Sequence, residues 1–338
     1  MIKKEIFRLD INDLKPESYF LARESYKRYG AFIIENSFSI SDVLNIREDC
    51  KKLFAKSGDK RLRYLKDVKS EEESLAFSNF FANEKLLNTI LAVFNNKSLY
   101  LLPPYNIAKN YLPHSINTEA MGWHRDCNGE LNYKECVSRL KNKEYFFAKI
   151  GVYLQTNSSY GGAIDIIPGS NNDYFGEIKL SNLNNFYVTS IVFLQRFFKP
   201  FYRLKFPRKF LLKLMKSKTL RISAGDVVIF DSRIMHKGTF ADEKIENLLK
   251  YDTKLLQADL PDKHTKYVLY SHLGNSLGIE SYFIDRLNRN KNSQEIKDWT
   301  KDQEKILELN LKKINLIPSL NIFKSLLTNS KKYASNAK

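Results

Sequence analysis

The sequence has few cysteines and no long apolar run, and these absences exclude several classes of protein. The three cysteines, Cys50, Cys127 and Cys136, are odd in number and lack CxxC spacing. This argues against a disulfide scaffold and against a zinc site built from thiolates. No run of about 18 apolar residues occurs, so we expect no transmembrane helix. Residues 1–5 begin no apolar segment, so we expect no signal peptide and a cytoplasmic location.

Acidic residues are missing from two long stretches of the chain. Residues 178–225 contain eleven Lys or Arg and no acid, and residues 309–338 contain six lysines and no acid. These stretches hold the whole net charge of +17, because the remaining 260 residues carry 38 charges of each sign. With 43% hydrophobic and 13% aromatic residues the chain can bury a full core, which excludes global disorder. The pattern indicates a neutral globular protein with two basic segments.

The expected order of elements is helix, then strands, then helix. Residues 41–53 and 84–94 show the helical period, with Ser41 or Asp42 as the cap of the first helix. From about residue 98 the chain changes to short β-rich runs separated by turn residues. These runs are 99–102, 105–111, 145–156, 163–167, 220–222, 226–230 and 266–271. Short strands at this density predict an antiparallel barrel or sandwich. After residue 278 we expect helix again.

His124 and Asp126 form an HxD triplet, which suggests a metal site. Because residues i and i+2 of an extended strand point to the same side, the imidazole and the carboxylate would converge. A second imidazole would complete a facial triad, which leaves open positions on iron(II) for a cosubstrate and dioxygen. Among the five histidines, His236 is the best candidate because it follows the β run 226–230. The triplet alone is a weak signal, and a structural role for either histidine stays open.

The HxD triplet is the first of four motifs that follow one another along the chain. They are WHRD at 123–126, GGAIDIIPGS at 161–170, GDVVIFDSR at 225–233, and His236 followed by Gly238. The series resembles the phytanoyl-CoA dioxygenase family, iron(II)- and 2-oxoglutarate-dependent oxygenases with a double-stranded β-helix (jelly-roll) core. The resemblance covers roughly residues 98–275. It implies a mainly β fold with flanking helices.

The resemblance and the composition divide the chain into three parts. Residues 1–97 are expected to form a helical region packed on the core. Residues 98–275 are expected to form the jelly-roll core, with a basic insertion at about 178–219. Residues 276–338 are expected to form a helical extension and a basic tail.

Carried over by position, the resemblance makes His124, Asp126 and His236 both the iron ligands and the catalytic centre. It implies Fe(2+), 2-oxoglutarate and O2 as cofactor and cosubstrates. Halogenating relatives leave the carboxylate position vacant, so the presence of Asp126 favours hydroxylation of an unactivated C–H bond. Asp231 and Arg233, before the distal histidine, are expected to pair with each other in a structural role.

The family also places a basic side chain after the distal histidine to hold the far carboxylate of 2-oxoglutarate. Lys266 occupies the corresponding strand, although it follows His236 by 30 positions and lacks the bidentate fork of arginine. Lys250 and Lys254 are alternatives. Other polar residues on predicted strands are candidate cosubstrate contacts or ordinary strand-surface residues. These are Lys149, Tyr153, Gln155, Asn106, Lys109 and Asn110.

The basic insertion is both aromatic and cationic over residues 190–218. A basic amphipathic segment of this kind, too short and too charged to span a bilayer, suits an anionic membrane surface. A lid or partner interface packed on the barrel is an alternative. Nucleic-acid binding is less favoured, because stacked bases need single exposed rings rather than an apolar face.

We therefore expect a cytoplasmic enzyme, peripheral to the inner face of the membrane, that hydroxylates a lipid-linked or anionic small molecule. A catalytically silent jelly-roll binding protein and a nucleic-acid-directed oxygenase are the alternatives. The complete His-Asp-His set argues against a silent protein, whereas a lysine at the cosubstrate position argues mildly for one.

Overall fold

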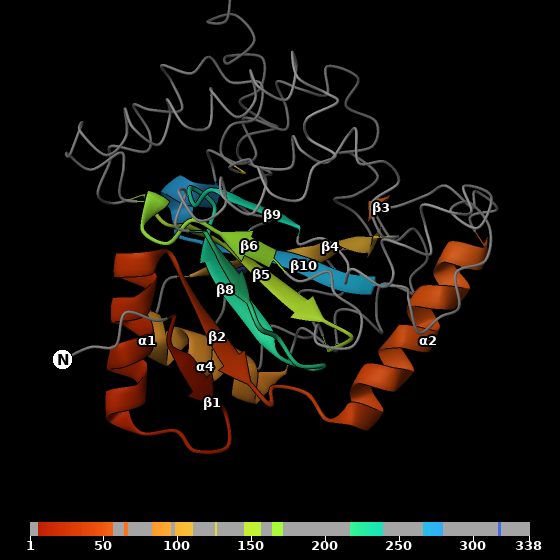
Figure 1. Cartoon of the computed structure of the whole chain (residues 1–338), viewed down its shortest axis with the longest axis horizontal. Coiled ribbons are helices and arrows are strands. Elements are labelled where there is room, and N and C mark those ends of the chain that lie inside the picture. Colours follow the sequence, from red (N-terminus) through yellow and green to blue (C-terminus); the bar gives the residue numbers. More distant parts are fainter. Residues whose placement is uncertain are drawn as a thin grey trace, which may run out of the picture.

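Two β-sheets and three helices make up the part of the chain that the computed structural model describes (Figure 1). The described residues are 6–56, 64–66, 83–95, 99–110, 126, 145–156, 164–171, 217–238, 266–279 and 317–318. Among them, no helix is both long enough and apolar enough to cross a membrane.

The larger sheet is mixed, with an antiparallel centre and parallel pairs at its margins. Its order is β1 (Arg8–Asp10), β2 (Ala31–Glu35), β8 (Val227–Asp231), β5 (Phe147–Tyr153), β10 (Lys266–Gly274), β4 (Tyr100–Asn110) and β11 (Ile317–Pro318). A further strand, β3 (Tyr64–Lys66), pairs with β4. The pairs β1–β2 and β4–β11 are parallel, and the described pairs between them are antiparallel. Strands β8, β5 and β10 therefore form the middle of the sheet.

The smaller sheet has the order β7 (Lys218–Leu220), β6 (Ile164–Ile166) and β9 (His236–Gly238), all antiparallel. It packs on one face of the larger sheet, where Ile164 and Leu220 share a buried cluster with Ile33, Val228 and Phe230. In Figure 1, β6 and β9 lie over the upper part of the larger sheet. The two sheets thus form a sandwich, consistent with the predicted sandwich or barrel, and the jelly-roll assignment stays a prediction.

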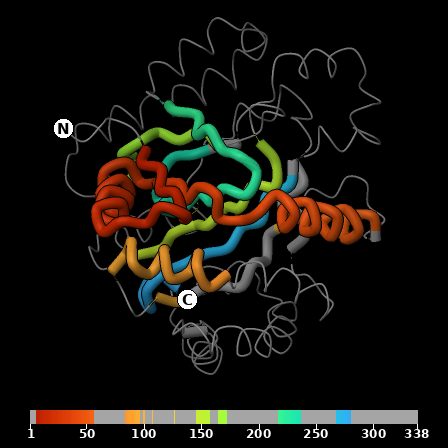
Figure 2. Tube along the Cα trace, turned by 90° about the horizontal axis from the view of Figure 1, so that it is seen from below, coloured from red at the N-terminus to blue at the C-terminus, as the bar shows by residue number. Residues whose placement is uncertain are grey.

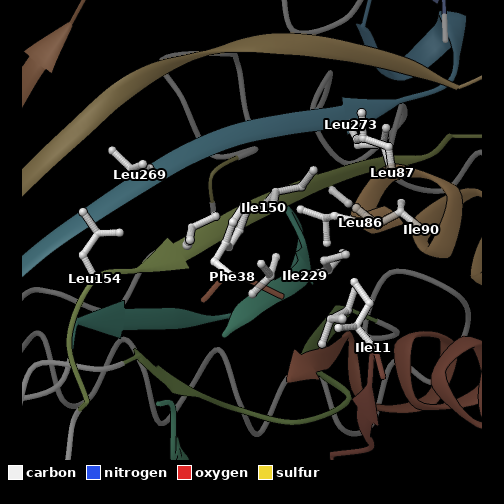
Figure 3. Close-up of a cluster of buried hydrophobic side chains, with 14 of the residues drawn as sticks. Ile11, Phe38, Leu86, Leu87, Ile90, Ile150, Leu154, Ile229, Leu269 and Leu273 are labelled. Carbon is white, nitrogen blue, oxygen red and sulfur yellow. The ribbon is translucent and has the colours of Figure 1, made fainter. Parts of the chain in front are cut away.

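Three helices cover the other face of the larger sheet. They are α1 (Pro16–Tyr29), α2 (Ile40–Lys56) and α4 (Glu84–Phe94). Figure 2 shows α1 and α4 side by side, with α2 extending away from them. Leu86 and Ile90 of α4 pack with Ile150 of β5 and Ile229 of β8 in one large buried cluster (Figure 3). Along β5, side chains alternate between this cluster and the inter-sheet space, which receives Lys149 and Tyr153.

The helices begin and end where their sequences supply caps. Gly30, with φ of +78°, ends α1 in the left-handed conformation and donates its N–H to Tyr26 O at 2.8 Å. Asn83 caps α4 through Oδ1, which accepts from Leu86 N at 3.0 Å. The predicted cap of α2 was wrong: Ser39 is the cap, not Ser41 or Asp42. The Ser39 hydroxyl accepts from Asp42 N at 3.1 Å, and the Asp42 carboxylate accepts from Ser39 N at 3.3 Å.

The predicted helices at 41–53 and 84–94 and most predicted strands are confirmed, but the N-terminal strands β1 and β2 were missed. The sequence predicted a mainly helical N-terminal region, whereas residues 31–35 pair with β8 near the centre of the sheet. Phe32 and Ile34 face the helices, and Ala31 and Ile33 face the smaller sheet. Because both faces of this strand are buried, the side chains at these four positions are all apolar and no period of two can be read.

Candidate functional site

Asp126 and His236 come together in the space between the sheets. Asp126 Oδ2 lies 3.7 Å from His236 Nε2. His236 is 4% exposed, whereas the Asp126 side chain keeps 20% of its surface accessible. With metal–ligand bonds of about 2.1 Å, two ligand atoms at right angles are about 3.0 Å apart. The pair therefore needs to close by less than about 1 Å to bind one metal ion.

The ring of His236 is oriented by a hydrogen bond within its own turn. Its Nδ1 lies 3.0 Å from the Ile234 carbonyl oxygen, which can only accept, so Nδ1 carries the hydrogen. In a neutral imidazole the lone pair is then on Nε2, the atom that faces Asp126. Nε2 and Oδ2 are atoms of the kind that bind metal ions, and their approach fits a metal ion held by both.

One turn, residues 231–236, positions both candidate ligands. Asp126 N donates to Ser232 O at 3.0 Å, so the turn holds the backbone of the aspartate. Met235 N donates to Ser170 Oγ at 2.8 Å, which ties the turn to the end of the predicted motif at 161–170. The histidine that ends the turn is held by its own ring hydrogen bond within the turn. The motifs at 123–126 and 161–170 are therefore both hydrogen-bonded to the turn that follows the motif run at 225–230.

The turn is built around a buried ion pair between Asp231 and Arg233, as predicted. Arg233 Nε donates to Asp231 Oδ1 at 2.7 Å, its Nη2 donates to Oδ2, and its backbone N donates to Oδ1 at 2.9 Å. The two residues are 1% and 7% exposed. Burial alone would lower the pKa of Arg233, but the neighbouring carboxylate outweighs burial and raises it. The pKa of Tyr26 on α1 is also raised, first by burial and second by the charge of Asp231.

Lys149 of β5 directs its ammonium group at Asp126. Its Nζ lies 3.0 Å from Asp126 Oδ2, the oxygen that also faces His236. The same Nζ lies 4.6 Å from the centre of the Tyr270 ring and 5.9 Å from that of Phe230. Lys149, one of the candidate cosubstrate contacts, therefore lies beside the candidate ligand Asp126.

Tyr270 of β10 belongs to the site and was not predicted. A side chain at Gly151, the residue opposite it on β5, would place Cβ only 3.1 Å from Tyr270 Cε1. The glycine therefore lets the tyrosine ring lie across β5 towards Lys149. Burial raises the pKa of Tyr153. The sequence signal for Tyr270 was its place in the predicted strand 266–271, on the same face as Lys266.

The other predicted contacts differ in where the structure places them. Tyr153 is fully buried in the inter-sheet cluster. Gln155 has a structural use, because its Oε1 accepts from Tyr267 N at 2.8 Å and from Arg47 Nη1 at 3.3 Å. Lys266 is the first residue of β10. In the backbone register of β10 against β4, Lys266 lies opposite Asn110 and Tyr270 lies opposite Asn106. The side chains of Lys266, Asn106, Lys109 and Asn110 are not among those described.

His124, Lys250 and Lys254 lie outside the described residues, as do residues 178–216 of the basic insertion. Among the residues that are described, no group of three or more His, Cys, Asp or Glu side chains could hold a metal ion. The structure thus brings together two of the three predicted ligands.

No protein-family model and no curated protein matches the sequence. Solved structures align with the chain at low identity, among them SnoN, a non-heme alpha-ketoglutarate-dependent epimerase from nogalamycin biosynthesis. It is 12% identical with a TM-score of 0.45, over 78% of this chain and 82% of its own. HygX from Streptomyces hygroscopicus, with nickel and 2-oxoglutarate bound, is 14% identical with a TM-score of 0.45, over 78% and 88%. EctD from S. alaskensis, with 2-oxoglutarate and 5-hydroxyectoine, is 13% identical with a TM-score of 0.43, over 75% of each chain. At such TM-scores the likeness carries no argument about this chain, and the assignment rests on its own residues.

Proposed function

We propose that the chain is an iron(II)- and 2-oxoglutarate-dependent oxygenase of the phytanoyl-CoA dioxygenase type, with His124, Asp126 and His236 as metal ligands. The observation that carries the proposal is the approach of Asp126 Oδ2 to His236 Nε2 at 3.7 Å, between two sheets. His124 precedes the aspartate by two residues in the sequence, and Asp126 lies in a turn rather than in the strand that the HxD spacing predicted.

The donor set suits this chemistry. Two imidazoles and one carboxylate leave three positions of an octahedral ion open, enough for a bidentate 2-oxo acid and dioxygen. Iron(II) bound there would supply dioxygen activation coupled to oxidative decarboxylation of the 2-oxo acid. In the overall reaction a substrate C–H bond, 2-oxoglutarate and O2 become an alcohol, succinate and CO2. One oxygen atom enters the alcohol and the other enters succinate.

The chain's own groups would bind and orient the reactants. His236 is kept in the metal-binding tautomer by Ile234 O, and Asp126 is held by the backbone of Ser232. We place Lys266 at the far carboxylate of 2-oxoglutarate, with Asn106 on the neighbouring strand, because β10 follows β9 along the chain and pairs with β4. The inter-sheet space contains a buried cluster of mostly aliphatic side chains, which would limit access of water.

Binding of the metal and cosubstrate tests the proposal directly. Anaerobic protein mixed with Fe(II) and 2-oxoglutarate should show the weak visible absorption of a metal–keto-acid chelate. Asp126→Asn and His236→Ala should both lose this absorption, because each removes a ligand atom. Asp13→Asn is the control for loss of a carboxylate, since Asp13 is exposed and pairs only with exposed Lys15 among the described contacts. Absorption that survives unchanged in both ligand variants would refute the proposed site.

A silent binding protein with the same fold would bind ligands without turnover. Release of succinate when the iron-loaded protein is given 2-oxoglutarate and a cell extract would distinguish the enzyme from this alternative. If the chelate forms and no succinate appears with any extract, the binding-protein hypothesis is favoured.

We propose further that the substrate is lipid-linked or anionic and that residues 190–218 bind an anionic membrane surface. The support is the charge distribution, because the acid-free stretch at 178–225 carries eleven of the excess positive charges. Sedimentation with anionic vesicles tests this. A variant lacking residues 190–218 that sediments as fully as the parent would eliminate membrane binding through this segment.

A further inference from the structure

A lysine ammonium group lies against the carboxylate that is proposed to bind the metal. Lys149 Nζ is 3.0 Å from Asp126 Oδ2, and both side chains are mostly buried, at 15% and 20% exposed. The same oxygen faces His236 Nε2. One carboxylate oxygen is therefore shared between a fixed cation of the protein and the candidate metal position.

The location of this ammonium is set by the sheet. On β5, Lys149 pairs with Phe230 of β8 on one side and with His272 of β10 on the other. Its Nζ is flanked by the rings of Phe230 and Tyr270. Surface lysines usually extend the ammonium into water. Here it is directed into the inter-sheet space, where a charge acts more strongly than in water.

A cation in this position has opposite effects on a metal and on an anion. A metal bonded to Asp126 Oδ2 at about 2.1 Å would lie within about 5 Å of Lys149 Nζ. Two positive charges at that separation repel, so the ammonium weakens binding of the metal alone. An anion that coordinates the metal contacts both cations, so the ammonium strengthens its binding.

We propose that Lys149, together with the metal, binds the carboxylate of the oxo acid that coordinates the metal, so that metal and anion bind as a coupled pair. This rests on the proposed function and adds to it a residue for the chelating end of the cosubstrate. The two carboxyl carbons of extended 2-oxoglutarate are about 5 Å apart. An ammonium group beside the metal-binding oxygen therefore reaches the near carboxylate, and the far one is left to another basic residue.

The coupling is measurable without turnover. The parent protein is titrated with Mn(II) by calorimetry, alone and with saturating oxalate, which carries the chelating carboxylates but no distant one. Lys149→Met should bind Mn(II) alone several-fold more tightly than the parent, because a repelling charge is removed. The factor by which oxalate raises Mn(II) affinity should fall by about tenfold, within the usual range of coupling between sites. Lys149→Arg, which keeps the charge, should retain most of the enhancement.

A surface lysine–aspartate pair provides the matched control. Lys52 lies 3.3 Å from Asp49 on α2 and is largely exposed, so Lys52→Met should change neither affinity. Where Lys149→Met lacks a cooperative urea transition, Lys149→Gln replaces it in the same titrations.

The outcomes separate this inference from the proposed function. If removal of Lys149 weakens binding of Mn(II) alone, the lysine only positions Asp126 and the inference is overturned. If binding of 2-oxoglutarate weakens while binding of oxalate does not, the lysine holds the far carboxylate, which also overturns it. If the parent protein binds no Mn(II), the proposed metal site itself is wrong.

Discussion

Removing one partner of the buried ion pair between Asp231 and Arg233 should destabilise the fold more than removing both. The residues are 1% and 7% exposed, and two side-chain hydrogen bonds join them. Arg233→Met leaves the carboxylate buried without its cation, and Asp231→Asn leaves the guanidinium buried without its anion. Breaking a buried pair by removing one partner costs about 3–5 kcal/mol, so each single variant should lose that much.

The double variant should cost less than either single variant. No uncompensated charge is then left in the interior, and the side-chain oxygen of the introduced asparagine can still accept from the backbone N–H of residue 233. We expect a loss of no more than about 2 kcal/mol. Urea denaturation followed by circular dichroism gives the free energy of unfolding by linear extrapolation. If each single variant costs under about 1 kcal/mol, or if the double variant costs their sum, the reasoning about this turn is wrong.

Three further predictions concern the scaffold around the site. Gly225 has φ of +88°, and a Cβ there would lie 2.7 Å from a backbone carbonyl oxygen, so Gly225→Ala should cost at least about 2 kcal/mol in urea denaturation. At Gly169, with φ of +82°, a Cβ would lie 3.3 Å from a backbone oxygen, so Gly169→Ala should cost less than Gly225→Ala. If the two variants lose equal stability, the close contact at Gly225 is not the cause of its loss. Ser39→Ala should lower the free energy of unfolding by about 1 kcal/mol through loss of the cap of α2, whereas Ser41→Ala should change it by under about 0.5 kcal/mol. Burial raises the pKa of the Cys50 thiol, so iodoacetamide should label this cysteine, as located by mass spectrometry, only after unfolding; labelling of the native protein at about pH 8 would contradict this.

Strands bounded by polar or turn residues could be predicted from the sequence. Residues 145–156 form a β-rich run that ends at Gln155 and Thr156, and 226–230 follow the turn at Gly225; both contain strands at the centre of the sheet. The strand at 31–35 has no alternation, because helices cover one of its faces and the smaller sheet covers the other. Burial on both faces removes the polar residues from which a period would be read.

The candidate site was predicted as a set of residue types, and its contacts were not. The HxD spacing and the run before His236 are local patterns, so Asp126 and His236 could be named in advance. The contact between Lys149 and Asp126 depends on which strands are neighbours, and the bridging of Tyr270 over Gly151 depends on the register of β10 against β5. Gln155 was a candidate cosubstrate contact because it lies on the same predicted strand as Lys149. In the structure its Oε1 accepts a hydrogen bond from the backbone N–H of Tyr267.

The sequence by itself determined which residues are candidate metal ligands, because the HxD triplet and the run before His236 are local patterns. It also determined where the excess positive charge lies along the chain. Only the tertiary structure decided that one turn holds both described candidate ligands and that an ammonium group lies against the carboxylate oxygen that faces His236. These features arise from hydrogen bonds and charges between segments far apart in sequence, and their geometry exists only once the sheets have packed.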